Sequence, residues 1–119
     1  ASYENIIFMP VVNLENSSAS GYVSSFLTEY GPAAIEVQFS KDNVAGMSLI
    51  PTIVDSGCRV WVNTLWESLC GGHEDEKAMR DPDANWGWVL DRGVTIIQTD
   101  RIAELINYLK SKGLRGRGN

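Results

Sequence analysis

The stretch from Gly93 to Leu114, GVTIIQTDRIAELINYLKSKGL, contains a complete β/α unit and decides the fold class. A run rich in β-branched residues, Val94–Thr99, predicts a buried strand. The residues after it follow the spacing of an amphipathic helix, and Gly113 is placed to end that helix. Asp100 lies at the junction, where we expect its carboxylate to cap the first helical turn and to lie near any pocket at this edge.

The same pattern of strand followed by helix occurs three more times before this stretch. Strands are predicted at residues 5–13, 33–40 and 59–65, in addition to the fourth strand at residues 94–99. Amphipathic helical patterns separate the strands. Four consecutive β/α units predict an α/β fold with a parallel sheet and right-handed crossovers. We expect one domain over residues 1–114 and a flexible tail over residues 115–119.

The alternation of side chains along the strands indicates which architecture the four units form. Apolar residues occupy one face of the strands, whereas the other face carries Glu36, Gln38, Asn63 and Gln98. A doubly wound sheet is covered by helices on both faces and should be apolar on both. A single polar face instead favours half of a (β/α)8 TIM-type barrel, whose inner wall faces a ligand. A solvent-exposed face or an edge strand is the alternative explanation.

The composition limits the partners of the chain. Its net charge of −5 disfavours binding to a nucleic acid backbone. The longest apolar run is far shorter than the roughly 20 residues that a membrane span needs. Cys58 and Cys70 flank the predicted third strand, whose length separates them too far for a disulfide, so we expect two free thiols. Because His73 is the only histidine, no four-ligand zinc site is predicted.

Two segments of the chain resemble the carboxy-terminal half of the glycerophosphodiester phosphodiesterase family. That family has a strand near V-x-V-W-T-V-N and, after a spacer, the motif G-V-D-G-I-I-T-D before its last helix. Here RVWVN supplies Trp61 and Asn63, and GVTIIQTD matches five of the eight positions of the closing motif. Thr95, Ile96 and Gln98 depart from that motif, and one residue fewer separates Trp61 from Asn63. The resemblance covers about residues 55–112, and the first 50 residues share only the β/α rhythm.

The resemblance implies a metal-assisted phosphodiester hydrolase of which this chain is the second half. The family's catalytic histidines, in H-R-G and H-D motifs, and its metal-binding carboxylates belong to the first half and are not found in this sequence. The complete enzyme would need an acid/base pair and a divalent cation, Mg²⁺ or Ca²⁺. We therefore expect the chain alone to bind no such cation and to be inactive. Exported relatives favour a periplasmic or secreted location over a cytoplasmic one.

The residues expected to line the pocket lie on the polar strand face and at its carboxyl edge. They are Glu36, Gln38, Trp61, Asn63, Gln98 and Asp100. Trp61 suits either a pocket wall for the substrate or simple core packing. The acidic segment Trp66–Asp83 follows the third strand and is either a lid over the substrate or a solvated loop leading into a short helix.

A half barrel would leave two sheet edges and its inner surface uncovered. We therefore expect self-association or association with the missing half, and a small phosphodiester as the substrate of the whole enzyme. Two other functions stay open: a non-catalytic binding module derived from the same barrel, and a small doubly wound domain that binds anions. Strand order separates the architectures, because a doubly wound sheet reverses its order and a barrel segment does not.

Overall fold

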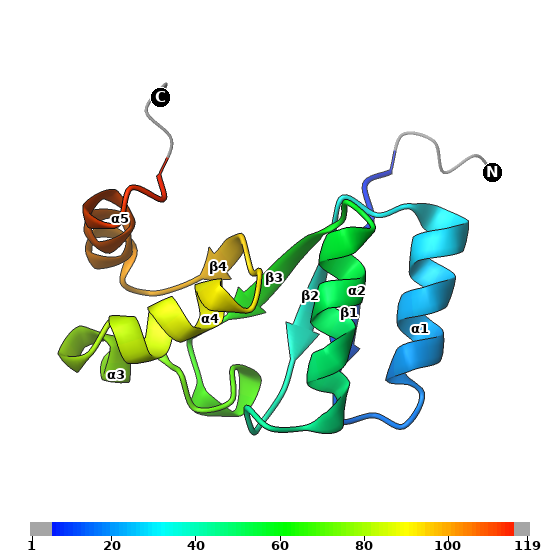
Figure 1. Cartoon of the computed structure of the whole chain (residues 1–119), viewed down its shortest axis with the longest axis horizontal. Coiled ribbons are helices and arrows are strands. Elements are labelled where there is room, and N and C mark those ends of the chain that lie inside the picture. The colour runs from blue at the N-terminus through cyan, green and yellow to red at the C-terminus, as the bar shows by residue number, and fades with distance from the viewer. Residues whose placement is uncertain (1–5, 116–119) are drawn as a thin grey trace.

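The computed structural model describes residues 6–115, which form a four-stranded parallel sheet with helices between the strands (Figure 1). The strands are β1 (Val11–Asn13), β2 (Ala34–Gln38), β3 (Arg59–Asn63) and β4 (Ile96–Gln98). Their spatial order is β1-β2-β3-β4, and every neighbouring pair is parallel. The predicted α/β class and parallel sheet are confirmed. The order has no reversal, which argues against the doubly wound alternative.

The strands are shorter than the sequence pattern predicts, most of all the first. Of predicted residues 5–13, Asn5 lies outside the described residues and only Val11–Asn13 form a strand. The ladder begins where Glu36 N–H donates to Pro10 O, at 2.9 Å. The register places Met9 opposite Ala34, the first residue of β2. The described residues before Met9 therefore run past the end of β2 and, within residues 6–115, have no strand to pair with.

Helices follow each strand, and 3₁₀ or π-helical turns extend several of them. They are α1 (Ala19–Ser25) with a π-helical turn (Phe26–Tyr30), a 3₁₀ turn (Ala45–Ser48) with α2 (Leu49–Asp55), a 3₁₀ turn (Glu67–Leu69), α3 (Asp75–Arg80), a π-helical turn (Asp83–Gly87) with α4 (Trp88–Asp91), and α5 (Ile102–Ser111). Within residues 6–115, no helix has the length and hydrophobicity needed to span a membrane.

The expected capping role of Asp100 is wrong. Helix α5 begins at Ile102, and its N-cap residue is Arg101, whose side chain makes no capping hydrogen bond. Asp100 therefore lies one residue too early for its carboxylate to reach the first free amides. Its own backbone N–H donates to Asp75 Oδ2 at 2.9 Å, so the acid that meets this junction comes from a distant part of the chain.

The main hydrophobic core lies between one face of the sheet and helices α1, α2 and α4. Its fully buried side chains include Ile35 and Val37 of β2 and Val60 and Val62 of β3. Helices α1 and α2 lie on the same side of the sheet, and α5 lies at the opposite end of the molecule from α1 (Figure 1). A smaller cluster joins α5 to α3 and the second π-helical turn, through Leu105, Ala78 and Trp86.

Both cysteines are buried and free, as predicted. Burial raises the pKa of the Cys70 thiol to about 12, and the nearby carboxylates of Glu74 and Asp75 act in the same direction. Burial also raises the pKa of Cys58. Neither thiol is therefore set up as a nucleophile, because the reactive form is the thiolate.

Gly46 provides a test of how closely the segment before α2 packs on the end of β1. A Cβ atom at Gly46 would overlap the backbone carbonyl oxygen of Leu14, which has no freedom to move aside. We expect Gly46→Ala to lower the free energy of unfolding by about 1–3 kcal/mol. The matched control is Gly21→Ala in α1, where a Cβ atom meets nothing within 4 Å. That change should raise stability by up to about 1 kcal/mol, through helix propensity. Urea denaturation followed by circular dichroism measures both, and equal effects would contradict the packing argument.

Candidate functional site

One face of the sheet carries two rows of aligned side chains that run across the strands. The first row contains Val11, Glu36, Trp61 and Ile96, and the second, nearer to the carboxyl ends, contains Asn13, Gln38, Asn63 and Gln98. No residue of these rows belongs to either hydrophobic cluster, so we call this side of the sheet the open face. In parallel α/β folds, ligands bind at the carboxyl ends of the strands, which is where the second row lies.

The structure brings five of the six predicted pocket residues onto the open face. They are Glu36, Gln38, Trp61, Asn63 and Gln98. Asp100 follows β4 at the same edge and is exposed. Asn13 was missed, although the sequence contains a signal for it, because Asn13 and Asn63 each follow a buried valine at the end of a strand.

Asn13 and Asn63 end their strands with the same local turn. Asn13 Oδ1 accepts a hydrogen bond from Glu15 N–H at 2.9 Å, and Asn63 Oδ1 accepts one from Leu65 N–H at 2.8 Å. A backbone N–H can pair only with the amide oxygen, so each side chain keeps its NH₂ group as a donor. The second row therefore offers hydrogen-bond donors from two strands at one edge of the open face.

Glu36 places a carboxylate at the centre of the open face. It is only 8% exposed, and its Oε2 accepts a hydrogen bond from Gln38 Nε2 at 3.1 Å. Within residues 6–115, Glu36 takes part in none of the ion pairs. A carboxylate this buried is costly unless a cation or further donors accompany it. This position therefore favours a cation or a hydroxyl group of a ligand or partner beside Glu36.

Trp61, next to Glu36 in the first row, has an unsatisfied polar atom. Its indole Nε1 is buried and has no hydrogen-bond partner among residues 6–115. An N–H group buried without an acceptor costs about 1–3 kcal/mol. An acceptor oxygen supplied by a ligand or a partner would remove this cost.

The charge of the open face limits which ligands it can bind without an additional cation. Its two rows contain one carboxylate and no lysine or arginine. An anionic phosphodiester would be repelled unless a cation stood between it and Glu36. Among the described residues, no group of three or more His, Cys, Asp or Glu side chains is arranged to hold a metal ion. Glu36 could therefore be one ligand of a cation whose other ligands come from outside these residues.

Asp75 is the best-connected polar side chain at the carboxyl edge. It is 3% exposed, and its Oδ1 accepts hydrogen bonds from Thr64 Oγ1 at 2.6 Å and from Trp86 Nε1 at 3.1 Å. Its Oδ2 accepts the backbone N–H of Asp100 at 2.9 Å. The carboxylate thus links the end of β3, the turn before α4 and the β4–α5 junction. Its role is structural and is not ligand binding.

His73 stabilises the loop between β3 and α3 through contacts of both its ring nitrogens. Its Nε2 lies 2.8 Å from Asp42 Oδ2, and its Nδ1 lies 2.9 Å from Ala84 O. The ring stacks on Trp88, with ring centroids 4.0 Å apart and planes within 4°. Both ring nitrogens are occupied by protein groups, so neither is available to a substrate in this arrangement.

The segment Trp66–Asp83 forms a loop that leads into a short helix, which is the second of the two structures predicted for it. Helix α3 begins at Asp75, and the Glu74 carboxylate caps it by accepting the backbone N–H groups of Glu76 and Lys77, each at 2.9 Å. The loop is less solvated than predicted, because Cys70 and Asp75 are buried. Glu76 forms a bidentate pair with Arg101, and this pairing raises the pKa of the guanidinium.

The comparison with protein families gives the identity of the domain but no activity. A family model described as a domain of unknown function, DUF4996, matches residues 8–109. The chain belongs to the DUF4996 family. The matched residues of this DUF4996 domain include all four strands and reach Leu109 in α5. A comparison with curated proteins finds no match to the chain.

The three hydrogen bonds of Asp75 give a prediction about the stability of this DUF4996 domain. Asp75→Asn would place an NH₂ group where the carboxylate now accepts bonds from Thr64, Trp86 and Asp100. We expect the free energy of unfolding to fall by about 2–4 kcal/mol, because buried donors lose their acceptor.

The control for this prediction is Asp55→Asn, at an exposed position near the end of α2. It should change stability by less than about 0.5 kcal/mol. Urea titrations of the three proteins at neutral pH measure both effects. A loss for Asp75→Asn no larger than that of the control would show that the buried carboxylate is not a structural anchor.

Proposed function

We propose that this chain is the carboxy-terminal half of a (β/α)8 barrel hydrolase of the glycerophosphodiester phosphodiesterase type. In this proposal the open face is one wall of the substrate pocket. The observation that carries the proposal is the row of amide side chains, with the Glu36 carboxylate beside it, on the open face of a parallel sheet without strand reversal. In such barrels the helices lie outside and the side chains of the opposite strand face point inward.

The arrangement of layers supports the barrel. All the helices that pack on the main core cover one side of the sheet, through residues such as Val23, Ile53 and Val89. The other side presents Glu36 and the Trp61 N–H, two groups that lack the partners their burial calls for. Both features are expected of a wall that faces the centre of a closed barrel.

The residues of this chain would bind and orient substrate, and the other half would carry the chemistry. Phosphodiester hydrolysis needs an acid/base pair, and a divalent cation, Mg²⁺ or Ca²⁺, to stabilise developing charge. The only histidine of the chain has both ring nitrogens engaged, so the catalytic histidines would come from the amino-terminal half. Trp61 would wall the pocket, the amide groups of Asn13 and Asn63 would donate to substrate oxygens, and Glu36 would face the cation.

A non-catalytic binding module built on the same half barrel is the second candidate. One observation favours it: the rows of the open face carry a single carboxylate and no histidine, which by themselves provide no acid/base pair. The two functions differ in what precedes the chain, because only the enzyme needs an amino-terminal half with H-R-G and Glu-x-Asp motifs.

The proposal predicts that activity appears only in the complete barrel. A polypeptide in which an amino-terminal half with those motifs is joined ahead of residue 1 should hydrolyse glycerophosphodiesters in a Mg²⁺- or Ca²⁺-dependent way. The 119-residue chain alone should not. In the complete protein, Glu36→Gln should lower kcat/KM by about 100-fold, since it removes a charge that faces the cation without changing its size.

The control is Glu104→Gln on α5, which changes a carboxylate whose side chain is 49% exposed. It should leave kcat/KM unchanged. Hydrolysis that survives Glu36→Gln undiminished would show that the open face is not the pocket wall. A parent reading frame without the histidine and carboxylate motifs would favour the binding module.

A further inference from the structure

Most of the exposed large apolar side chains in residues 6–115 belong to the first β/α unit, and two more belong to the last. Eight of the ten large apolar residues that are exposed in the described chain belong to the first or the last β/α unit. Those of the first unit are Ile6, Ile7, Phe8, Val11, Tyr22 and Tyr30, and those of the last unit are Ile102 and Leu114. The two middle units contribute only Val54 and Trp66. A free-standing domain has no reason to place them this way, whereas a domain that is covered at both ends does.

These two ends are also the edges of the sheet. Among residues 6–115, strands β1 and β4 each pair on one side only, so each presents a row of backbone groups without a strand beside it. The first and last units lie at opposite ends of a molecule that measures 45 × 35 × 23 Å (Figure 1). The open face lies between them, so a partner that covered both edges would also enclose it.

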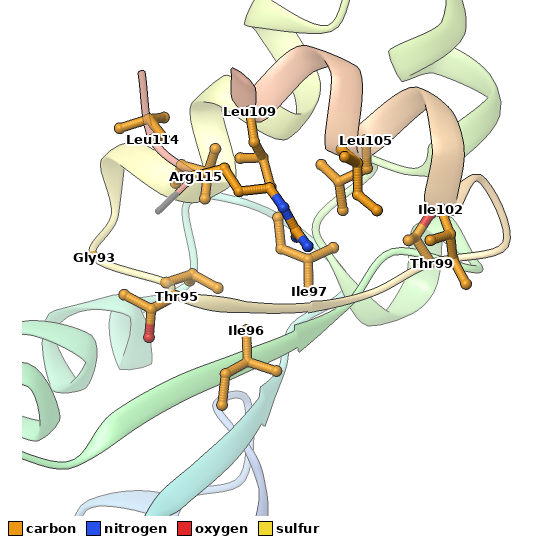
Figure 2. Close-up of a pocket in the computed structure, with 13 residues that line it drawn as sticks. Gly93, Thr95, Ile96, Ile97, Thr99, Ile102, Leu105, Leu109, Leu114 and Arg115 are labelled. Atoms are coloured by element: carbon orange, nitrogen blue, oxygen red, sulfur yellow. The ribbon is translucent and has the colours of Figure 1, made fainter. Parts of the chain in front are cut away.

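The edge at β4 is hollowed. A groove of about 530 Å³ runs between β4 and α5, and its lining includes Ile97, Leu105 and Leu109. Figure 2 shows these side chains between the strand and the helix, with Ile96 pointing to the other side of the strand. The groove is mainly apolar, so it suits packed side chains of a partner better than a charged ligand.

The two ends carry opposite charge. Residues 6–33 contain Glu15 and Glu29 and no lysine, arginine or histidine. Residues 94–115 contain four cations against two carboxylates, the cations being Arg101, Lys110, Lys112 and Arg115. Because Arg101 and Lys112 already pair with Glu76 and Asp83 of the third unit, the positive charge that the last unit offers a partner comes from Lys110 and Arg115, against the two carboxylates of the first unit. This complementarity is between two parts of the same chain, which is what association of identical copies uses.

We propose that a second copy of this chain covers both edges, with β1 of each copy set against β4 of the other. The proposal rests on the half-barrel architecture given under the proposed function, and the second copy takes the place that the amino-terminal half holds there. Two sheets of four parallel strands joined in this way close into eight strands. Eight is the number at which side chains fill a barrel interior. The two-fold axis makes both junctions identical, so the assembly closes at two copies.

Closure would also provide partners for the unsatisfied groups of the open face. The two open faces would turn toward each other inside the barrel and bring the amide rows of both copies together. Asn and Gln side chains both donate and accept, so the rows can pair with one another. The Trp61 N–H would meet acceptor oxygens of the other copy, which it lacks among the described residues.

Light scattering during gel filtration of the 119-residue chain tests the proposal. We expect twice the 13.1 kDa monomer mass at micromolar concentration. Ile7→Lys at the first edge and Ile102→Lys at the last edge alter residues that are 88% and 62% exposed, so circular dichroism should show both variants folded. Each should raise the dimer Kd by about 100-fold or more, because a charge is buried at the junction.

The matched control is Trp66→Lys, which introduces the same charge at an equally exposed residue of a middle unit, also 62% exposed. It should leave the Kd unchanged. A wild-type monomer, an open-ended series of larger assemblies, or a dimer that neither edge variant weakens would each overturn the proposal. The second edge variant keeps the test decisive if the first one fails to fold.

This outcome is separable from the proposed function, because association is measured without any hydrolysis. A confirmed dimer together with no activity in the joined protein would remove the enzyme and leave the dimer. A monomeric chain that becomes active when joined to an amino-terminal half would do the reverse.

Discussion

The attachment of the last β/α unit depends on the buried carboxylate of Asp75. Three donors from separate parts of the chain, the Thr64 hydroxyl, the Trp86 indole and the Asp100 amide, converge on its two oxygens. A carboxylate shared by several donors in a low-dielectric site stabilises all of them together. The small cluster of Leu105, Ala78 and Trp86 packs in the same region, so polar and apolar contacts hold α5 in one position.

The polar groups of the loop after β3 and those of the open face differ in how fully they are hydrogen-bonded. The groups of the loop after β3 are used for structure: Asp75 joins three segments, Glu74 caps α3, and His73 bridges Asp42 and Ala84. The open face differs, because Glu36 and Trp61 are buried there without a full set of partners. Incomplete satisfaction in an otherwise well-bonded chain is the physical reason to place ligand or partner contacts on that face.

The sequence pattern was sufficient for the α/β class, the parallel sheet and most of the open face, and insufficient where distant residues meet. Alternation within a strand depends only on backbone geometry, so Glu36, Gln38, Asn63 and Gln98 could be assigned to one side. The cap expected at Asp100 failed because α5 begins one residue later than the sequence pattern indicates, and the carboxylate that bonds the Asp100 amide comes from a residue 25 positions earlier. Neighbouring acids look alike in sequence, yet Asp75 is buried whereas Glu76 pairs with Arg101 at the surface. Only the packed chain distinguishes them.

The features that support the open face as a pocket wall also support the proposal that a partner covers this sheet. A parallel sheet with unpaired edges exposes backbone groups, and the open face carries buried polar groups that need partners. Helices satisfy neither requirement, because those that pack on the main core cover the opposite side. A partner that closed both edges would therefore also determine the environment of Glu36 and Trp61. In the proposed assembly, closure of the edges and binding at the open face would therefore be coupled, and a change at either edge would alter the environment at the centre of the sheet.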